Sequence, residues 1–115
     1  MAKKLAVDRK CTVVITGKDD IVSDGNKTYI VSNGDSMMAK VVGTGCMAAS
    51  VIGTFIAVEK DLALAAAAGL SCYEIAAELA AKDSKGPGSF KENLFDEIFN
   101  LDRNKISSRS RIKAV

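Results

Sequence analysis

The chain has 115 residues, of which 48% are hydrophobic and 26% charged, a composition that excludes an intrinsically disordered chain and allows one domain with a modest core. Its net charge of +2 is unevenly distributed: residues 1–10 carry +3, residues 11–102 carry −6 and residues 103–115 carry +5. We interpret the basic ends as solvated segments and predict no nucleic-acid partner, because the C-terminal tail has no aromatic side chain to stack on bases.

Three cysteines, Cys11, Cys46 and Cys72, are odd in number and lack the spacing of metal ligands, and the chain contains no histidine, so no zinc site is expected. No signal peptide is recognisable after Met1, and the longest apolar stretch, residues 46–58, is too short to span a bilayer. We therefore expect a cytoplasmic protein without a membrane partner, in which Cys11 is a small core residue.

The first expected elements are the end of a helix at residues 2–10 and a strand at residues 11–15. The strand segment, Cys-Thr-Val-Val-Ile, is a short unbroken run typical of a parallel strand buried on both faces. Thr16 and Gly17 close this strand at its carboxyl end, where open α/β sheets bind their ligands.

A β-hairpin is expected next. Asp24 and Gly25 form a strong signal for a tight turn between residues 21–23 and residues 27–32. Asp24 is accordingly interpreted as a turn former and not as a catalytic acid.

Gly43, Thr44, Gly45 and Cys46 precede a long apolar run, and this pattern predicts a tight loop that leads into a helix. Glycine permits positive φ and close backbone approach, and Thr44 can cap the helix. Unpaired N–H groups and the helix dipole at such a terminus attract phosphate or developing negative charge. The helix is apolar on nearly all sides and is expected to be buried, with Gly53 marking close packing against another element.

An alanine-rich helix is predicted from residue 62 to residue 82, beginning near Asp61. Glu74, Glu78 and Lys82 are spaced by four and are expected to mark its solvent-exposed face.

A third helix is expected to begin at Ser89, because Ser-Phe-Lys-Glu at residues 89–92 forms a capping box. The preceding Gly-Pro-Gly at residues 86–88 either borders an active site or is a stiff connector. Residues 1–102 are expected to form the folded part of the chain, and residues 103–115 a flexible basic tail.

Several of these segments together resemble the C-terminal half of the hydroxyethylthiazole kinases. The residues that carry the resemblance are Val-Val-Ile-Thr-Gly at 13–17, Lys-Val-Val-Gly-Thr-Gly-Cys at 40–46 and Gly-Pro-Gly-Ser-Phe at 86–90. Most ribokinase-like kinases carry aspartate where this chain has Cys46, and cysteine there indicates the thiazole branch. The resemblance implies a ribokinase-like three-layer α/β/α fold, of which this chain would supply the C-terminal half: short strands and a hairpin, then three helices.

The resemblance also implies an activity, the transfer of the γ-phosphoryl group of ATP to the hydroxyl of 4-methyl-5-(2-hydroxyethyl)thiazole in thiamine salvage. In that family, the residue at the Thr16 position contacts ATP and the residue at the Gly43 position contacts the thiazole. Gly43, Thr44 and Gly45 would offer backbone N–H groups to the moving phosphoryl group, and Cys46 would assist deprotonation of the substrate hydroxyl. ATP chemistry implies Mg²⁺, whose ligands cannot be identified in the sequence.

Other interpretations stay open. The chain lacks the N-terminal half of the resembled family, so we expect a fragment, a truncated product or one part of an assembly, and it could be a non-catalytic or oligomerising module. A homo-oligomer is expected because the resembled family is trimeric, with active sites between subunits. Another ribokinase-like enzyme, such as a hydroxymethylpyrimidine kinase, is a further alternative, against which Cys46 argues.

Overall fold

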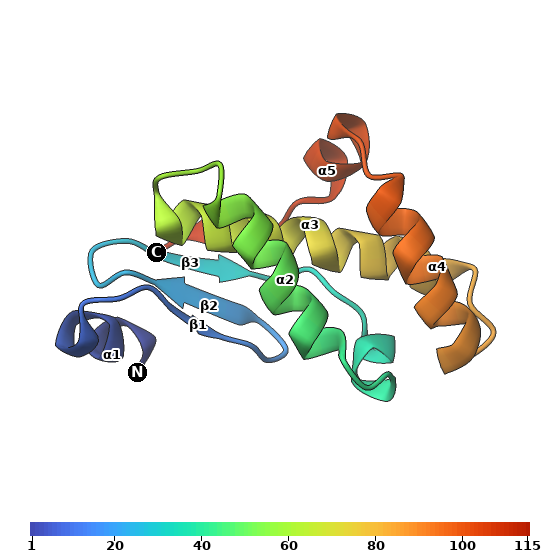
Figure 1. Ribbon diagram of the computed structural model, residues 1–115, viewed down its shortest axis with the longest axis horizontal. Coiled ribbons are helices and arrows are strands. Elements are labelled where there is room, and N and C mark those ends of the chain that lie inside the picture. Colours follow the sequence, from blue (N-terminus) through green and yellow to red (C-terminus); the bar gives the residue numbers. More distant parts are fainter.

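The computed structural model describes residues 1–115. Its elements are α1 (Ala2–Arg9), β1 (Val13–Ile15), β2 (Asp20–Ser23), β3 (Thr28–Val31), the 3₁₀ helix η1 (Ser36–Lys40), α2 (Thr44–Ile56), α3 (Leu62–Lys82), α4 (Pro87–Phe99), α5 (Arg103–Arg109) and β4 (Ile112–Ala114). The fold is α/β, as expected, with α3 packed on the sheet and α2 and α4 packed on α3 (Figure 1).

The four strands form one antiparallel sheet in the order β1-β2-β3-β4. The prediction of a parallel strand at residues 11–15 is therefore wrong: β1 pairs antiparallel with β2, Val14 opposite Val22, and its side chains are half-buried. Cys11 precedes this strand and is exposed, so it is not a core residue. A run of five apolar or β-branched residues predicts a strand but does not specify the direction of its neighbour.

The predicted hairpin is confirmed, with β2 and β3 joined by a turn at Asp24 and Gly25. Asp24 Oδ1 accepts hydrogen bonds from the N–H groups of Asn26 at 2.8 Å and Lys27 at 2.7 Å. These backbone hydrogen bonds lower the pKa of Asp24 and fix the turn, as expected for a turn-forming aspartate.

The core forms around α3, which begins after Asp61 as expected, and Asp61 Oδ1 caps it by accepting from Leu64 N–H at 3.2 Å. The largest fully buried apolar side chains of the molecule are Tyr73, Phe90, Leu70, Ile75, Leu94, Val22 and Val31. By length and a mean hydropathy of 1.4, α3 is apolar enough to cross a membrane, which the sequence analysis missed. However, 72% of its apolar window is buried inside the chain, which is the pattern of a central core helix.

The expectation that α2 is buried is wrong. The helix begins at Thr44, but only Ala48 on it is buried, because α2 packs against α3 along one side and no element of this chain covers its other side. Gly53 lies on the open side, with nothing within 4 Å of the position that a Cβ atom would take. The close approach between helices occurs instead at Gly69 of α3.

The third predicted helix, α4, begins two residues earlier than expected, at Pro87. Proline is favoured at the first helical position because its φ angle fits and its missing N–H would have no partner there. Ser89 lies at the third position, and its Oγ accepts from the N–H groups of Lys85 at 2.9 Å and Gly86 at 3.3 Å. The serine therefore binds the start of the helix from inside its first turn.

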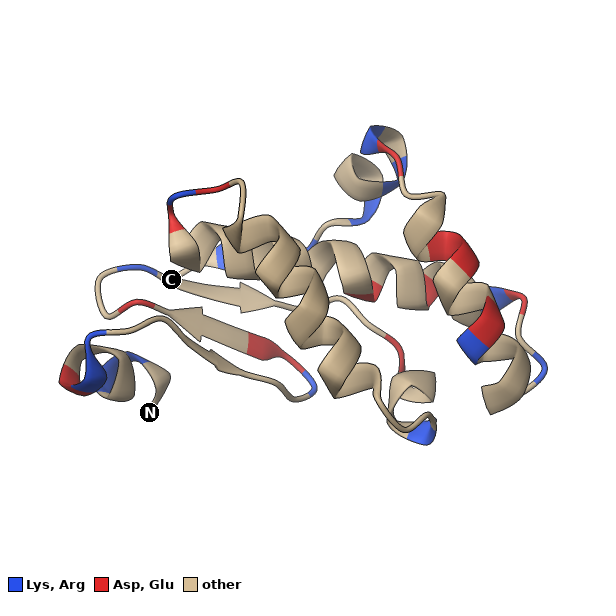
Figure 2. Ribbon diagram, in the orientation of Figure 1, with Lys and Arg blue, Asp and Glu red and all other residues tan.

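Residues 103–115 are not the unstructured tail that their charge suggested. Asp102 Oδ1 accepts from Lys105 N–H at 2.8 Å and so caps α5, and β4 then pairs with β3, with Ile112 opposite Val31. The pairing saturates the outer edge of β3. Figure 2 colours the Lys and Arg positions of α5 and of the segment after it blue, and Arg103, Arg111 and Lys113 are exposed. Alternation of Ile112 with charged residues is the strand signal that the net charge obscured.

Candidate functional site

A cleft of about 700 Å³ opens beside the start of α2. The segments that line it are residues 16–20 between β1 and β2, residues 32–36 after β3, residues 38 and 39 of η1, residues 44, 45 and 48 of α2, and residues 70, 73 and 74 of α3. The cleft thus lies where the β1–β2 turn, the segment after β3 and two helices meet, and most of the residues that line it are not hydrophobic.

The start of α2 is built by Gly43, which has φ of 97° and serves as the N-cap residue without offering a side chain. A Cβ atom at Gly43 would meet nothing within 4 Å, so glycine is favoured here by the left-handed backbone and not by lack of room. The N–H groups of the first turn consequently have no side-chain cap, and the positive end of the helix dipole lies at the rim of the cleft.

The Thr44 side chain does not cap α2, contrary to expectation. Its Oγ1 donates to Met38 O at 3.0 Å and lies 3.3 Å from Val41 O, so it holds the preceding 3₁₀ turn against the helix. From α3, the Tyr73 hydroxyl donates to Thr44 O at 2.9 Å. The loop before α2 is therefore fixed from two sides, which suits a site that must hold backbone donors in place.

The predicted site residues fall into two groups. Thr16, Thr44 and Gly45 come from distant parts of the sequence and line the same cleft. Gly43 and Cys46 lie beside it: neither belongs to the lining, and Cys46 is exposed in the first turn of α2. The structure thus brings the predicted phosphate-binding residues together and places the other two at their edge.

Glu74 is a cleft residue that the sequence analysis assigned wrongly to the solvent-exposed face of α3. Its side chain is only 6% exposed, and Oε2 has no hydrogen-bond partner in the chain. Burial, and next the nearby carboxyl group of Asp20, raise the pKa of Glu74 to about 9, so the side chain is neutral at physiological pH. The burial of Glu74 could have been predicted from the sequence, because Glu74 follows Leu70 by four positions and so lies on the same face of the helix.

Asp20, the second buried carboxyl group of the cleft, is 3% exposed and begins β2. Its Oδ1 accepts from Gly17 N–H at 2.9 Å and thereby shapes the turn that carries Thr16. Acidic side chains are frequent around the cleft, yet no group of three or more Asp, Glu, Cys or His side chains in the chain could hold a metal ion.

The family model of the hydroxyethylthiazole kinases matches residues 1–104. The chain belongs to this family. A hydroxyethylthiazole kinase of Methanosarcina mazei is 50% identical over 113 residues, which are 98% of this chain and 43% of the relative. One of Methanosarcina acetivorans is 52% identical, covering 94% of this chain and 41% of the relative.

A solved structure gives the same result for the fold. The hydroxyethylthiazole kinase protein from Pyrococcus horikoshii OT3 superposes with a TM-score of 0.96 at 37% identity, over 99% of this chain and 44% of that chain. The ribokinase-like assignment, with this chain as the C-terminal part of the family fold, is thereby confirmed. The chain spans 41–43% of the length of the curated hydroxyethylthiazole kinases that it matches.

Proposed function

We propose that this chain carries the phosphate-binding part of a kinase that transfers the γ-phosphoryl group of ATP to the hydroxyl of 4-methyl-5-(2-hydroxyethyl)thiazole. The supporting observation is that Thr16, Thr44 and Gly45 line one cleft at a helix start without a side-chain cap, in a chain of the hydroxyethylthiazole kinase family. Phosphoryl transfer depends mainly on positioning and on stabilising charge, which such a helix start supplies.

In this proposal the triphosphate lies in the cleft, where the Thr16 hydroxyl and the backbone N–H groups of Thr44 and Gly45 bind its oxygens. Asp19, Asp20 and Asp35 also line this cleft, and the protonation of Glu74 keeps a further negative charge away from the phosphates. The wall that Glu74 contributes is then polar without being anionic.

The thiazole alcohol approaches from the rim, where Gly43 and Cys46 lie beside the cleft. Cys46 is exposed at the third position of α2 and is free to reach a substrate hydroxyl. In its thiolate form it would take up the hydroxyl proton, and become a thiol, as the phosphoryl group transfers. ATP and alcohol would thus meet across the first turn of α2.

Magnesium accompanies ATP in most phosphoryl transfers, but the residues of this chain do not form a ligand set for it. No step of the proposed reaction is therefore assigned to a metal held by this chain. The unpaired state of all three cysteines supports a reducing compartment, and we propose the cytoplasm.

A second candidate function is a non-catalytic or oligomerising module. The observation that favours it is the uncovered side of α2. Exposed apolar side chains before, on and after that helix, Val42, Ile56 and Val58, could bind a second copy of the chain.

The test is to incubate the purified chain with ATP, Mg²⁺ and the thiazole alcohol and to measure the phosphate ester by mass spectrometry. Formation of the ester supports the proposal, and preference for 4-amino-5-hydroxymethyl-2-methylpyrimidine would favour the pyrimidine kinase instead. ATP binding without either product would support the non-catalytic module. Sedimentation of the same sample measures its oligomeric state.

A further inference from the structure

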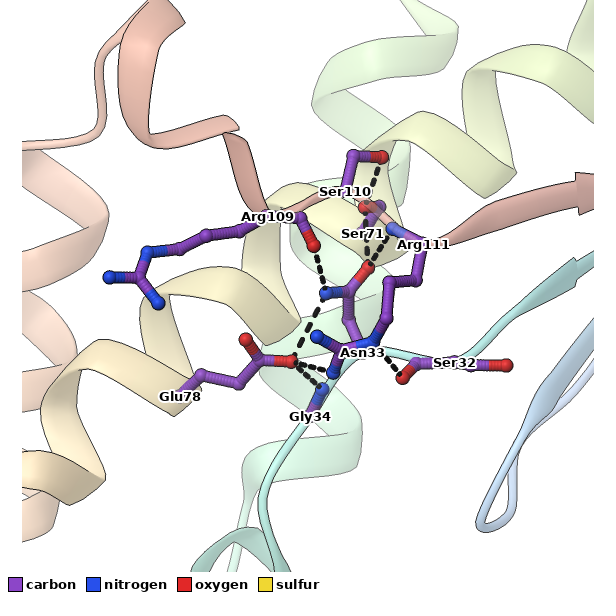
Figure 3. A network of polar contacts seen from close by, with 8 residues as sticks. All are labelled: Ser32, Asn33, Gly34, Ser71, Glu78, Arg109, Ser110 and Arg111. Atoms are coloured by element: carbon purple, nitrogen blue, oxygen red, sulfur yellow. Dashed lines mark hydrogen bonds and ion pairs between the residues drawn. The ribbon is translucent and has the colours of Figure 1, made fainter. Parts of the chain in front are cut away.

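A buried amide lies directly behind the cleft. Asn33, 6% exposed, uses both ends of its side chain (Figure 3). Its Oδ1 accepts from Ser71 Oγ at 2.9 Å and from Arg111 N–H at 2.9 Å. Its Nδ2 donates to Glu78 Oε1 at 3.1 Å and to Arg109 O at 2.9 Å. The four hydrogen bonds join the segment after β3 to α3 and to residues 103–115.

Arg111 reinforces the same connection through its side chain and backbone. Its Nε donates to Ser32 O at 2.9 Å and its Nη2 donates to Glu78 Oε1 at 2.6 Å. The backbone of Ser32 donates in return to Arg111 O at 3.0 Å. Glu78 Oε1 also accepts from Gly34 N–H at 2.9 Å. Ser32, Asn33 and Gly34 are thus each bonded to Arg111 or Glu78.

These three residues form a wall of the cleft. They belong to the lining segment 32–36, which shares the cleft with Thr16 and Thr44. Gly34 lies so close to the neighbouring wall that a Cβ atom on it would be 3.5 Å from the carboxyl carbon of Glu74. A small displacement of this segment would therefore change the cleft.

We propose that Arg111 and Glu78 are positioning residues of the candidate site, which hold residues 32–34 against α3 so that the cleft keeps the shape its ligand requires. The proposal rests on the proposed function in naming that ligand as ATP.

The charges support a positioning role. The Glu78 side chain is 14% exposed, and Arg111 provides its only ion-pair partner, while Arg111 itself is 55% exposed. Without the guanidinium, a mostly buried carboxylate would lose its counter-charge while still accepting from Gly34 and Asn33. The resulting strain falls on the wall of the cleft, because those two residues are its other hydrogen-bond donors.

The test compares Arg111→Ala with Lys113→Ala in the 115-residue chain. Each variant removes one positive charge from the C-terminal segment, Arg111 directly before β4 and Lys113 within it. Lys113 is exposed and lies opposite Ile30, away from the cleft wall. Amide hydrogen exchange at Gly34 and neighbouring wall amides should accelerate at least about tenfold in Arg111→Ala, since hydrogen bonds to charged groups are the stronger ones. Lys113→Ala should exchange like the wild type.

The second readout is affinity for MgATP, measured by calorimetry, which should fall about tenfold in Arg111→Ala and stay unchanged in Lys113→Ala. Arg111→Lys keeps a charge near Glu78 but loses the fork that also reaches Ser32, so its exchange should accelerate less, at the same amides. This milder variant decides the question if the alanine variant does not fold.

Unchanged exchange at Gly34 in the Arg111 variants, or acceleration of all amides in equal measure, including those of β2, would overturn the positioning role. The first result would mean that the wall does not need Arg111, and the second that Arg111 contributes only to global stability. If the wild-type chain binds no ATP, the proposed function is contradicted, while the exchange comparison still decides the role of Arg111.

Discussion

Gly69 of α3 and Ile52 of α2 meet at their backbones: a Cβ atom on Gly69 would lie 3.3 Å from the Cα atom of Ile52 and 3.3 Å from the Phe55 ring. A backbone atom cannot move aside as the end of a flexible side chain can. The spacing of the two helices, and with it the position of the α2 N-terminus beside the cleft, therefore depends on this glycine.

Gly69→Ala should destabilise the chain by about 1–3 kcal/mol, the range for inserting a methyl group into a tightly packed contact. Gly53→Ala is the matched control on α2, where the added methyl group meets nothing and should stabilise the helix by up to about 1 kcal/mol. Urea unfolding measures both changes. A Gly69→Ala variant as stable as the wild type would show that the helices can separate without cost.

Glu74→Gln should change how stability depends on pH. The pKa of Glu74 is about 9 in the folded chain and near 4.5 in the reference state, so between these values the folded chain keeps a proton that the unfolded chain releases. Stability therefore falls as pH rises through this window, by at most about 1.4 kcal/mol per pH unit.

The glutamine variant lacks the titrating carboxyl group and stays neutral in both the folded and the unfolded chain. It should be more stable than the wild type at pH 8 and similar to it near pH 4.5, as thermal midpoints would show. Asp20, Glu78 and Arg111 are the charged groups that influence Glu74 in the fold, and all three are retained in the comparison. Parallel pH profiles for the two proteins would contradict the raised pKa.

Tyr73→Phe should loosen the start of α2. The Tyr73 hydroxyl donates to Thr44 O. Burial, and next the negative charge that Glu74 carries above its own pKa, raise the pKa of Tyr73 to about 12, so the donor stays protonated. Loss of this hydrogen bond should cost about 0.5–1.5 kcal/mol and weaken ATP binding several-fold. Tyr29→Phe is the matched control: it also removes a tyrosine hydroxyl group, but from β3, and should leave ATP binding unchanged. Equal effects of the two variants on ATP affinity would argue against the role of Tyr73.

Cys46 variants test the proposed proton acceptor in the phosphorylation assay. Cys46→Ala should lower turnover by about 10²-fold, the low end for general-base assistance, because a thiol is poorly matched to an alcohol. Cys46→Asp should restore the rate, since a carboxylate can take up the same proton. Because Cys46 is exposed, both variants should keep the wild-type thermal midpoint. Full turnover by the alanine variant would remove Cys46 from the mechanism.

Features of this fold that depend on neighbouring residues could be predicted from the sequence. Asp24 and Gly25 determine their turn locally, and Asp61 caps its helix from one position away. The cleft was predictable in part, because glycine at position 43 permits the left-handed backbone from which α2 starts. These signals depend on φ angles and short-range hydrogen bonds, which the sequence encodes directly.

Features that depend on distant partners were predicted wrongly. The exposure of α2 depends on what covers it, the burial of Glu74 depends on Asp20 and the cleft, and the order of residues 103–115 depends on the edge of β3. In each case the residue types of the segment predicted one degree of burial or order, and the packing of distant segments produced another. The role of Arg111 also depends on residues that are distant in the sequence. Arg111 lies 78 positions from Asn33, 79 from Ser32 and 33 from Glu78.

The pairing of β4 with β3 also has a consequence for synthesis in the cell. During translation β3 leaves the ribosome long before β4, and closing a loop of that length is slow compared with forming the hairpin. For that interval the outer edge of β3 is bare and can pair with another nascent chain. The cleft wall at residues 32–34 is then the last part of the site to be secured, so crowded polysomes should favour misassembly at this edge.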